Sequence, residues 1–340
     1  MKAWVVTRYG GPEVMVLNDL PEPQPGRGEV LVHVRAIGLN FADLFGRMGV
    51  YPATPRPPFV PGLEFAGEVE DTGETVTRFP VGTPVMGYSR HGSHAEYVAV
   101  KESSLIRMPE GMSFENAAAF PAVSMTAYHG LVRLANLRKG EKLLVHAAAG
   151  GVGIATVQLG RSLGAEIFAT AGSDEKLRVA THHGAHHIFN YRTDDFAAEI
   201  RKITEGYGVD VVMDSVGGTV FRRSWPLLAG MGRYVLFGVA AVTGDGGLSR
   251  LKAVRVFASM LPLMPPALIG QNRGIFGFNL GTLAGKESYL REAAGEILAL
   301  LERGVFQPVV GRVFPFAEMV EAHRFLQTRQ SFGKVVVQVD

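Results

Sequence analysis

The sequence of 340 residues contains no cysteine. Disulfide bonds, cysteine-ligated zinc and a thiol nucleophile are therefore excluded. An excess of either charge is also missing, because 34 basic residues face 32 acidic ones and the formal net charge is +2. This balance is too close to neutral to indicate a nucleic-acid partner, and we expect none.

A long apolar run is missing as well. The most apolar stretch, about residues 253–270, is interrupted by Arg255 and three prolines, which makes it a poor membrane span. The chain enters a strand pattern directly after Met1, without a charged leader and a cleavage site. We therefore expect a cytoplasmic enzyme without stable membrane insertion, and the length predicts about two domains.

What the chain does contain is a glycine-rich turn between two regular patterns. A short apolar run, residues 142–147, leads into Gly150, Gly151 and Gly153, and apolar residues then recur at helical spacing. This order predicts a strand, a phosphate-binding turn and a helix, because glycines let the backbone approach a phosphate and a helix N-terminus attracts an anion. Ala148 stands where the GxGxxG pattern has its first glycine, so a tight turn without a ligand stays open as an alternative.

The residues after the next predicted strand, 165–171, decide which dinucleotide would fit. An NAD site has an acidic residue there for the ribose 2′-hydroxyl, whereas this chain has Gly172, Ser173 and, one turn later, Lys176. Ser173 and Lys176 can donate hydrogen bonds to a 2′-phosphate, and charge-assisted bonds are strong. We therefore predict NADPH as the cofactor; a plain helix cap by Ser173 and a solvated Lys176 are the alternatives.

Two kinds of pattern divide the chain. Up to about Pro121, short strands alternate with loops rich in proline and glycine, which indicates a β-rich module. Strands then alternate with helices, which is typical of a doubly wound parallel sheet. The final stretch, from about residue 286, predicts helix, strand, helix and strand, and we expect it to return to the first module. The strands expected in the parallel sheet are 142–147, 167–171, 188–190, 209–213, 234–238 and 274–278.

Further motifs carry a resemblance to a known family. They are Gly38-Leu39-Asn40-Phe41-Ala42-Asp43, the stretch 61–69 and the stretch 272–281. Together with the glycine turn, they make the chain resemble the medium-chain dehydrogenase/reductase superfamily, more narrowly its zinc-independent quinone oxidoreductases, and most of all the branch that contains VAT-1. The resemblance covers nearly the whole chain in order.

The resemblance implies an α/β protein in which a GroES-like, β-rich catalytic domain, residues 1–121 and 283–340, holds an inserted Rossmann domain with a doubly wound parallel sheet, residues 122–282. It implies NADPH as the cofactor, an active site in the cleft between the domains, and a homodimer that in many members joins the edge strands equivalent to 274–278. It implies no zinc, since Asn40 and Leu63 stand where metal-dependent relatives have Cys and His ligands.

The implied function is an NADPH-dependent, zinc-independent reductase that transfers hydride to quinones or α,β-unsaturated carbonyls. These small molecules are already electron-poor, so positioning and hydrogen-bond donors can supply most of the catalytic effect. By the same resemblance, Asn40 and Tyr51 act beside the nicotinamide, and Asp43 holds their loop or bonds an amide. For Asp43 a turn-stabilising role is the alternative, and for Tyr51 a packed loop aromatic. The residues implied to line the cofactor path are Asn40, Thr126, Gly150, Gly151, Val152, Gly172, Ser173, Lys176, Tyr191, Phe237, Gly238, Phe276, Gly277, Phe278 and Lys334.

Other functions stay open. One is an NADPH-binding scaffold of the VAT-1 type, or a lipid- or partner-binding protein with little activity, motivated by the apolar stretch 239–270; that stretch would otherwise wall the substrate site or a dimer contact. Another is an enoyl-thioester reductase, which would need a basic groove for the phosphate of coenzyme A. A metal site at the histidines of residues 182–187 is disfavoured because Gly184 interrupts them, and a substrate contact by His94 stays open. The apolar residues of the stretch are Met260, Leu261, Leu263, Met264, Leu268 and Ile269.

Overall fold

The computed structural model of the protein describes residues 1–340 apart from 245–246, 249, 261–264 and 284. Leu261, Leu263 and Met264 of the apolar stretch thus lie outside the described residues. Contacts divide the chain into two compact units. Unit 1 consists of Met1–Val123, Gly281–Glu302 and Pro308–Asp340, and unit 2 of Ser124–Leu280 and Arg303–Gln307.

Unit 1 is built on a largely antiparallel sheet with the strand order β16-β17-β3-β4-β5-β7, and β6 also pairs with β3. Val30, Val32 and Val34 of β3 are fully buried, as their alternation predicts, but Leu31 and the residues from Ala36 to Leu39 are buried as well, so the strand is covered on both faces over much of its length. Strand β17 pairs with β3, so the final stretch returns to the first module as expected. The strands of unit 1 are β1 (Lys2–Val6), β2 (Met15–Asp19), β3 (Glu29–Leu39), β4 (Glu64–Thr72), β5 (Pro84–Tyr88), β6 (Tyr97–Lys101), β7 (Leu105–Arg107), β16 (Val310–Pro315) and β17 (Lys334–Gln338).

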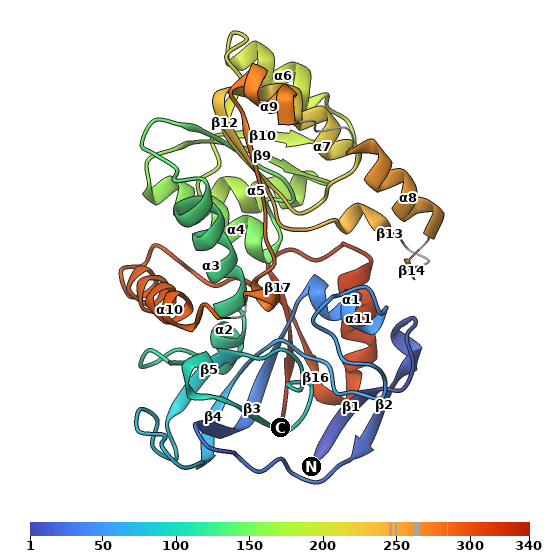
Figure 1. Ribbon diagram of the computed structural model, residues 1–340, viewed down its shortest axis with the longest axis vertical. Coiled ribbons are helices and arrows are strands. Elements are labelled where there is room, and N and C mark those ends of the chain that lie inside the picture. Colours follow the sequence, from blue (N-terminus) through green and yellow to red (C-terminus); the bar gives the residue numbers. More distant parts are fainter. Residues whose placement is uncertain (245–246, 249, 261–264, 284) are drawn as a thin grey trace. The chain divides into compact units, whose positions relative to one another are not determined.

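Helices of different lengths connect and cover these strands (Figure 1). Helix α2 begins after Ser113, which is its N-cap because the Ser113 hydroxyl accepts the N–H of Asn116. Helix α11 packs on β17 and buries Met319 and Leu326 in the core that β3 shares. The helices are α1 (Phe41–Arg47), α2 (Phe114–Ala118), α10 (Glu287–Glu302), α11 (Met319–Gln327), the first residues of α3 (Pro121–Tyr128), and the 3₁₀ helices η1 (Pro12–Val14), η2 (Glu102–Ser104) and η7 (Phe316–Glu318).

Unit 2 contains the parallel sheet, with the strand order β10-β9-β8-β11-β12-β15. Numbered along the chain, this is the order 3-2-1-4-5-6 of the Rossmann fold. The order reverses between β8 and β11, and dinucleotides bind at the carboxyl ends of the strands at such a switch point. The strands are β8 (Lys142–Val145), β9 (Glu166–Ala171), β10 (His187–Asn190), β11 (Val209–Asp214), β12 (Leu228–Leu236) and β15 (Gly274–Gly277), and β13 (Thr243–Gly244) pairs apart from them with β14 (Gly247–Leu248).

The helices of unit 2 follow the strands in alternation. Helix α4 packs on β8 and β9, and α5 packs on β9 and β10. Capping residues fix where helices begin and end: Ser173 caps the start of α5, Asp195 caps the start of α6, and Gly184 ends α5 with a φ of 116°. The helices are the rest of α3, the π-helix η3 (His129–Leu134), α4 (Gly151–Ser162), α5 (Asp174–His183), α6 (Phe196–Ile203), α7 (Thr219–Ser224), η4 (Trp225–Leu227), η5 (Ala240–Val242), α8 (Arg250–Ser259), α9 (Pro265–Gln271) and η6 (Leu280–Thr282), which runs into unit 1.

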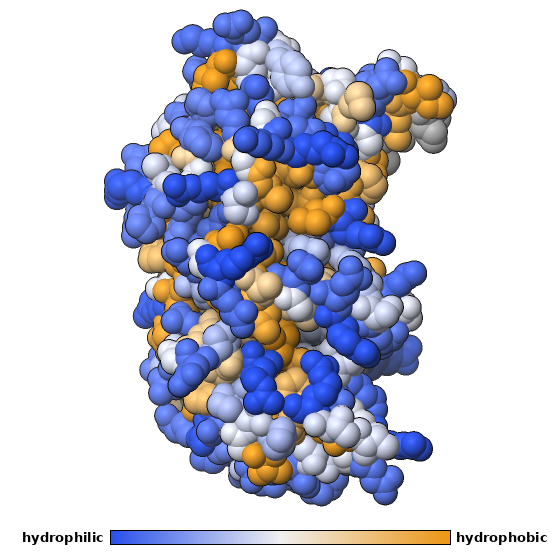
Figure 2. All heavy atoms as spheres, turned by 90° about the vertical axis from the view of Figure 1, so that its left-hand side faces the viewer, coloured by the Kyte–Doolittle hydropathy of each residue, from blue (hydrophilic) through white to orange (hydrophobic). Residues whose placement is uncertain are grey.

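The surface is mixed in character. On the face drawn in Figure 2, hydrophilic side chains predominate and apolar ones lie between them. Among the described residues, no helix combines the length and the apolarity that crossing a membrane requires.

Candidate functional site

The glycine turn of unit 2 has the geometry of a phosphate-binding turn. Strand β8 ends at Val145, and the backbone N–H groups of His146 and Ala148 donate to Met213 O at 3.0 Å and Thr170 O at 3.0 Å. The turn is thus tied to both neighbouring strands. Gly150 is the N-cap of α4, so Gly151 and Val152 form its first turn, where N–H groups are unpaired within the helix. The left-handed position of the turn is occupied by Ala147, at φ 51°.

Gly153 brings α4 close to its strand, as its place in the turn predicts. A Cβ at this position would collide with the carbonyl oxygen of Ala147 and would lie 2.7 Å from Cα of Ala148. Only glycine therefore permits this approach of the helix to the turn.

The end of β9 forms a second part of the site. A Cβ on Gly172 would lie 2.5 Å from the hydroxyl oxygen of Tyr191 and 3.4 Å from Nε of Arg192, so these two side chains lie over a bare stretch of backbone. Ser173 accepts the N–H of Lys176 at 3.4 Å and is therefore the helix cap that the sequence allows as an alternative. The hydroxyl hydrogen of Ser173 is not used by that bond, so the cap leaves the serine able to donate.

Positive charge gathers at this second part. Burial lowers the pKa of Lys176, the nearby Arg192 lowers it further, and Glu175 acts in the opposite direction. Two cations held close together favour an anion between them. Arg192 is not among the residues predicted from the sequence; the signal for it is its place directly after Tyr191, at the carboxyl end of the strand β10 that neighbours β9.

Aromatic residues follow the last two strands of the parallel sheet. The rings of Phe237, after β12, and Phe278, after β15, are stacked with centroids 6.0 Å apart, and the ring of His129 lies 4.7 Å from that of Phe278. Thr126 lies in α3 one turn before His129, on the same side of the helix. Phe276 and Gly277 belong to β15 itself, and Gly238 packs so closely on Ser215 that a Cβ would lie 2.7 Å from its carbonyl oxygen.

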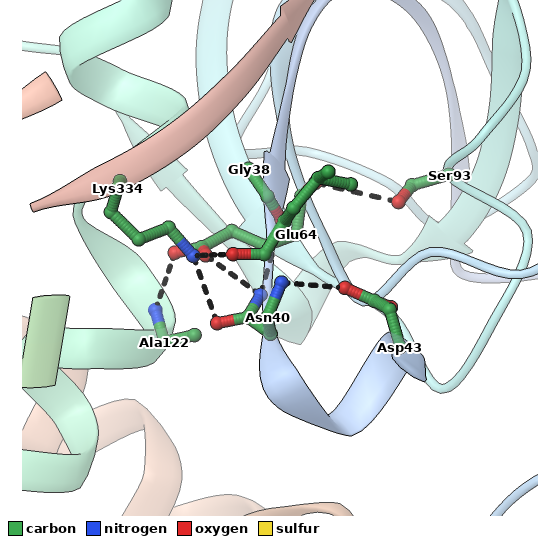
Figure 3. A network of polar contacts seen from close by, with 8 residues as sticks. Gly38, Asn40, Asp43, Glu64, Ser93, Ala122 and Lys334 are labelled. Carbon is green, nitrogen blue, oxygen red and sulfur yellow. Dashed lines mark hydrogen bonds and ion pairs between the residues drawn. The ribbon is translucent and has the colours of Figure 1, made fainter. Parts of the chain in front are cut away.

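Unit 1 brings Asn40, Glu64 and Lys334 together in one buried network, shown in Figure 3. The Lys334 ammonium donates to Glu64 Oε2 at 2.6 Å, to Asn40 Oδ1 at 2.8 Å and to the carbonyl oxygen of Leu39 at 2.8 Å. The other carboxylate oxygen of Glu64 accepts the Ala122 N–H at 2.6 Å. Glu64 is fully buried and Lys334 is 4% exposed, so this is a buried ion pair. All three ammonium hydrogens have acceptors within unit 1, and the predicted contact of Lys334 with the cofactor stays a prediction.

The network fixes the direction of the Asn40 amide. Its Nδ2 donates to Gly38 O at 3.1 Å and to Glu64 Oε2 at 3.1 Å, which uses both amide hydrogens. Its Oδ1 accepts from Lys334 and keeps one lone pair. In this arrangement the partly exposed Asn40 can accept one more hydrogen bond but cannot donate one.

Asp43 supports the same loop from the first turn of α1. Its Oδ2 accepts the backbone N–H of Asn40 at 2.7 Å, which is one of the two contacts of a capping box. Burial raises the pKa of Asp43 to about 7, while the N–H groups of Asn40 and Leu63 and the charge of Lys334 act in the opposite direction. This contact fits a loop-holding role and the turn-stabilising alternative equally, so the catalytic role of Asp43 stays a prediction.

Two further candidates of unit 1 are Tyr51 and His94. Tyr51 is partly exposed in the segment after α1, where its carbonyl oxygen accepts the N–H of Thr54 at 3.1 Å. His94 is fully buried against Gly62 and His323, and burial lowers its pKa to about 3. His94 is thus a neutral core residue in this structure.

The residues at the former zinc positions do not fit a metal. The amide of Asn40 presents one lone pair, Leu63 offers no ligand atom, and the carboxylate of Glu64 is neutralised by Lys334. Among the described residues, no group of three or more His, Asp or Glu side chains is placed to hold a metal ion. The histidines of residues 182–187 have other contacts: His186 accepts the Ile167 N–H, and His187 pairs with Glu166.

Nearly the whole chain is similar to known proteins. A family model for zinc-binding dehydrogenases matches residues 183–337, and one for the alcohol dehydrogenase GroES-like domain matches residues 26–110. The synaptic vesicle membrane protein VAT-1 homolog of Rattus norvegicus is 38% identical over 99% of this chain and 84% of its own length. A quinone oxidoreductase of Pseudomonas aeruginosa is 37% identical over 97% of both chains. The solved structure of Escherichia coli quinone oxidoreductase complexed with NADPH has a TM-score of 0.87 at 29% identity, covering 99% of this chain and all of that one.

Proposed function

Because the chain belongs to the medium-chain dehydrogenase/reductase superfamily, as an oxidoreductase related to VAT-1 homologs and quinone oxidoreductases, we propose that it is an NADPH-dependent, zinc-independent reductase of quinones or α,β-unsaturated carbonyls. The observation that carries the proposal is the pair of cations, Lys176 and Arg192, beside the bare backbone of Gly172 at the end of β9. That position binds the adenosine ribose in a Rossmann fold.

The residues of unit 2 fit NADPH in particular. Lys176 and Arg192 favour a 2′-phosphate over a hydroxyl, Ser173 has a hydroxyl hydrogen to donate, and Tyr191 covers Gly172 where an adenine would lie. The first turn of α4 offers backbone N–H groups to a pyrophosphate. When bound, NADPH supplies a hydride. Phe237, Phe278 and their neighbours provide the apolar wall for the nicotinamide end.

Unit 1 would supply the polar groups around the acceptor. Asn40 has one free lone pair and suits an amide N–H such as that of the nicotinamide carboxamide, because its own hydrogens are used. The donor to a developing oxyanion must therefore come from another residue, and we propose Tyr51. Without a metal, the acceptor has to delocalise negative charge by itself, as quinones and enones do.

The first experiment measures NADPH consumption with benzoquinone, a polycyclic quinone, an alkenal and a cyclic enone. Turnover well above background supports the reductase, and the ranking selects between quinones and carbon–carbon double bonds. Folded protein that turns over none of them contradicts the proposal.

The cofactor assignment has its own test. Lys176→Gln and Arg192→Gln should each weaken NADPH binding about tenfold or more and leave NADH binding unchanged, because each removes a charge-assisted bond to the 2′-phosphate. Arg178→Gln, an exposed arginine of the same helix, is the matched control. If all three variants keep the wild-type ratio of NADPH to NADH affinity, the 2′-phosphate site is elsewhere.

A groove of unit 1 is a reason to test a thioester substrate as well. It has a volume of about 380 Å³ and an apolar floor at Phe79, Leu105 and Ile106, and Arg78, Arg107 and Arg291 surround it. An enoyl-CoA therefore belongs in the substrate panel. Turnover of that substrate which falls in Arg291→Gln, while quinone turnover does not, would favour a thioester.

A second candidate function is binding of a lipid surface or a protein partner. Val254, Phe257 and Ile269 are 64, 50 and 77% exposed in α8 and α9, within the apolar stretch noted in the sequence. Exposed large apolar residues of this kind often mark contact surfaces. Co-sedimentation with anionic liposomes, with and without NADPH, tests the lipid version, and no binding in either case rules it out.

We also propose a cytoplasmic homodimer. Strand β15 lies at one end of the strand order of the parallel sheet, and within the described residues no strand pairs with its outer side, so that edge suits a second copy. Light scattering that gives the mass of one chain at micromolar concentration would contradict the dimer.

A further inference from the structure

Unit 2 contains five buried polar side chains that interact one after another, through three hydrogen bonds and the interaction of Ser224 with Tyr234. They are His146 after β8, Thr170 in β9, Asp214 at the end of β11, Ser224 at the end of α7 and Tyr234 in β12, and we call them the histidine chain. None is more than 3% exposed. Buried polar groups are costly unless they are paired, so a fully connected set of five in one core needs a reason.

The contacts are short. His146 Nδ1 lies 2.8 Å from Thr170 Oγ1, and its Nε2 lies 2.7 Å from Ser224 Oγ. Ser224 also interacts with the hydroxyl of Tyr234, and that hydroxyl donates to Asp214 Oδ2 at 2.7 Å. The chain thus connects the glycine-turn end of β8 to the end of β11.

The carboxylate of Asp214 sets the direction of every hydrogen. Because Asp214 only accepts, Tyr234 donates to it, and the phenol oxygen then accepts from Ser224. Because the single hydroxyl hydrogen of Ser224 is donated to Tyr234, the Ser224 oxygen accepts from Nε2–H of His146. Nδ1 of His146 is then bare and accepts from Thr170. Burial lowers the pKa of His146 to about 4, which keeps the ring neutral and preserves one donor and one acceptor nitrogen.

Asp214 in turn holds the loop after β11. Its carboxylate accepts the N–H of Val216 at 2.7 Å and that of Gly217 at 3.1 Å, and Gly217 and Gly218 have φ values of 69° and 62°. This loop binds the next one: Ala240 N–H donates to Ser215 O at 3.0 Å, and Ala241 N–H donates to Val216 O at 2.9 Å. The second loop follows Phe237 and Gly238.

We propose that His146 is a positioning residue for NADPH, which sets the glycine turn against the loops after β11 and β12 so that the pyrophosphate and the nicotinamide end are held in register. This inference rests on the proposed NADPH binding. The turn begins at the residue after His146, so a change in the chain moves the turn and the loops relative to each other. The 2′-phosphate residues Lys176 and Arg192 lie outside the chain.

The test compares a whole cofactor with a fragment. Ser224→Ala cuts the histidine chain between His146 and Tyr234, and Thr204→Val is the matched control, since Thr204 is a buried hydroxyl of unit 2 whose partners are Ile200 O and Gly208 N. Calorimetry measures the affinity of each variant for NADPH and for 2′-AMP, which reports only on the 2′-phosphate end. We expect Ser224→Ala to bind NADPH about tenfold more weakly with unchanged 2′-AMP affinity, and Thr204→Val to keep both affinities.

A histidine series adds a readout that a merely structural role would not change. His146→Gln keeps an amide that can donate to Ser224, so it should bind NADPH more tightly than His146→Leu, with thermal stability measured for both. Wild-type NADPH affinity in Ser224→Ala, or equal losses for NADPH and 2′-AMP, overturns the inference. Wild-type protein that does not bind NADPH overturns the proposed function instead, and the inference with it.

Discussion

At the scale of single residues, the buried pair of Lys334 and Glu64 is the contact whose loss should cost most. Lys334→Met leaves the Glu64 carboxylate buried without its cation, which typically destabilises a protein by about 3–5 kcal/mol. The double variant Glu64→Gln with Lys334→Met removes both charges and should lose less than the single variant. Chemical denaturation measures the free energy of unfolding. If the double variant is less stable than Lys334→Met, this view of the pair is wrong.

Tyr51 gives a second prediction at this scale. If its hydroxyl donates to the developing oxyanion, Tyr51→Phe should lower kcat about a hundredfold and leave the KM for NADPH unchanged, because the bond strengthens only in the transition state. Tyr9→Phe is the control, since the Tyr9 hydroxyl bonds Pro55 O in the same region at 3.4 Å. Equal kcat values in both variants, across all acceptors, would remove Tyr51 from the mechanism.

Residue types at short spacing could be predicted, but partners far apart in the chain could not. The glycine turn and the Ser173 cap follow from local chemistry, and both are present. The contact of Lys334 with Glu64 joins residues 270 positions apart, so no local sequence pattern predicts it. The same holds for Arg192, which matters only because β10 pairs with β9.

At the scale of elements, the close approach of α4 to the glycine turn means that alanine should have opposite effects on stability at two helical glycines. Gly153→Ala places a Cβ against the backbone of Ala147 and Ala148, so the helix must shift, at a cost of about 1–3 kcal/mol and with weaker NADPH binding. Gly295→Ala in α10 has no atom within 4 Å of the new Cβ and should stabilise the protein by about 0.5–1 kcal/mol. Thermal denaturation measures the change in stability of each variant. Changes of the same sign in the two variants would refute the packing argument.

Elements were predictable where their pattern is regular. The strands β8, β9, β10, β11 and β15 lie where the apolar runs predict them. Strand β12 is different, because it begins at Leu228 and not at Tyr234. Its first half contains Gly230 and Gly232, which hide the strand pattern, and the register shifts between Val209 and Val211 of its neighbour. It ends at Leu236, two residues before Gly238 packs closely on Ser215, and no local sequence pattern indicates that contact.

At the scale of the whole molecule, buried histidines make stability depend on pH. Burial, opposed by Asp214 and reinforced by Arg223, lowers the pKa of His146 to about 4. Unfolded protein takes up a proton on this ring below about pH 6.5, and folded protein does so only near pH 4. His146 therefore contributes fully above pH 6.5, and its contribution falls by about 1.4 kcal/mol per pH unit between those values.

The variant His146→Gln isolates this contribution. Its free energy of unfolding should fall less steeply than that of the wild type between pH 6.5 and about pH 4, and denaturant titrations at several pH values measure the slopes. Parallel slopes would mean that the ring is already protonated when folded. Asp43, whose pKa is raised to about 7, acts in the opposite sense in unit 1, where its contribution to stability grows as the pH falls from 7 toward 4.

The pairing of β17 with β3 sets an order of events during protein synthesis. The ribosome makes β3 early, then nearly all of unit 2, and only afterwards Lys334–Gln338, which completes the sheet of unit 1. Until then the part of β3 from Ala36 to Leu39 lacks its partner β17, and the carboxylate of Glu64 has no cation. Unit 2 can therefore fold before unit 1 is complete, and a chain cut short before Lys334 would contain a complete unit 2 and an incomplete, aggregation-prone unit 1.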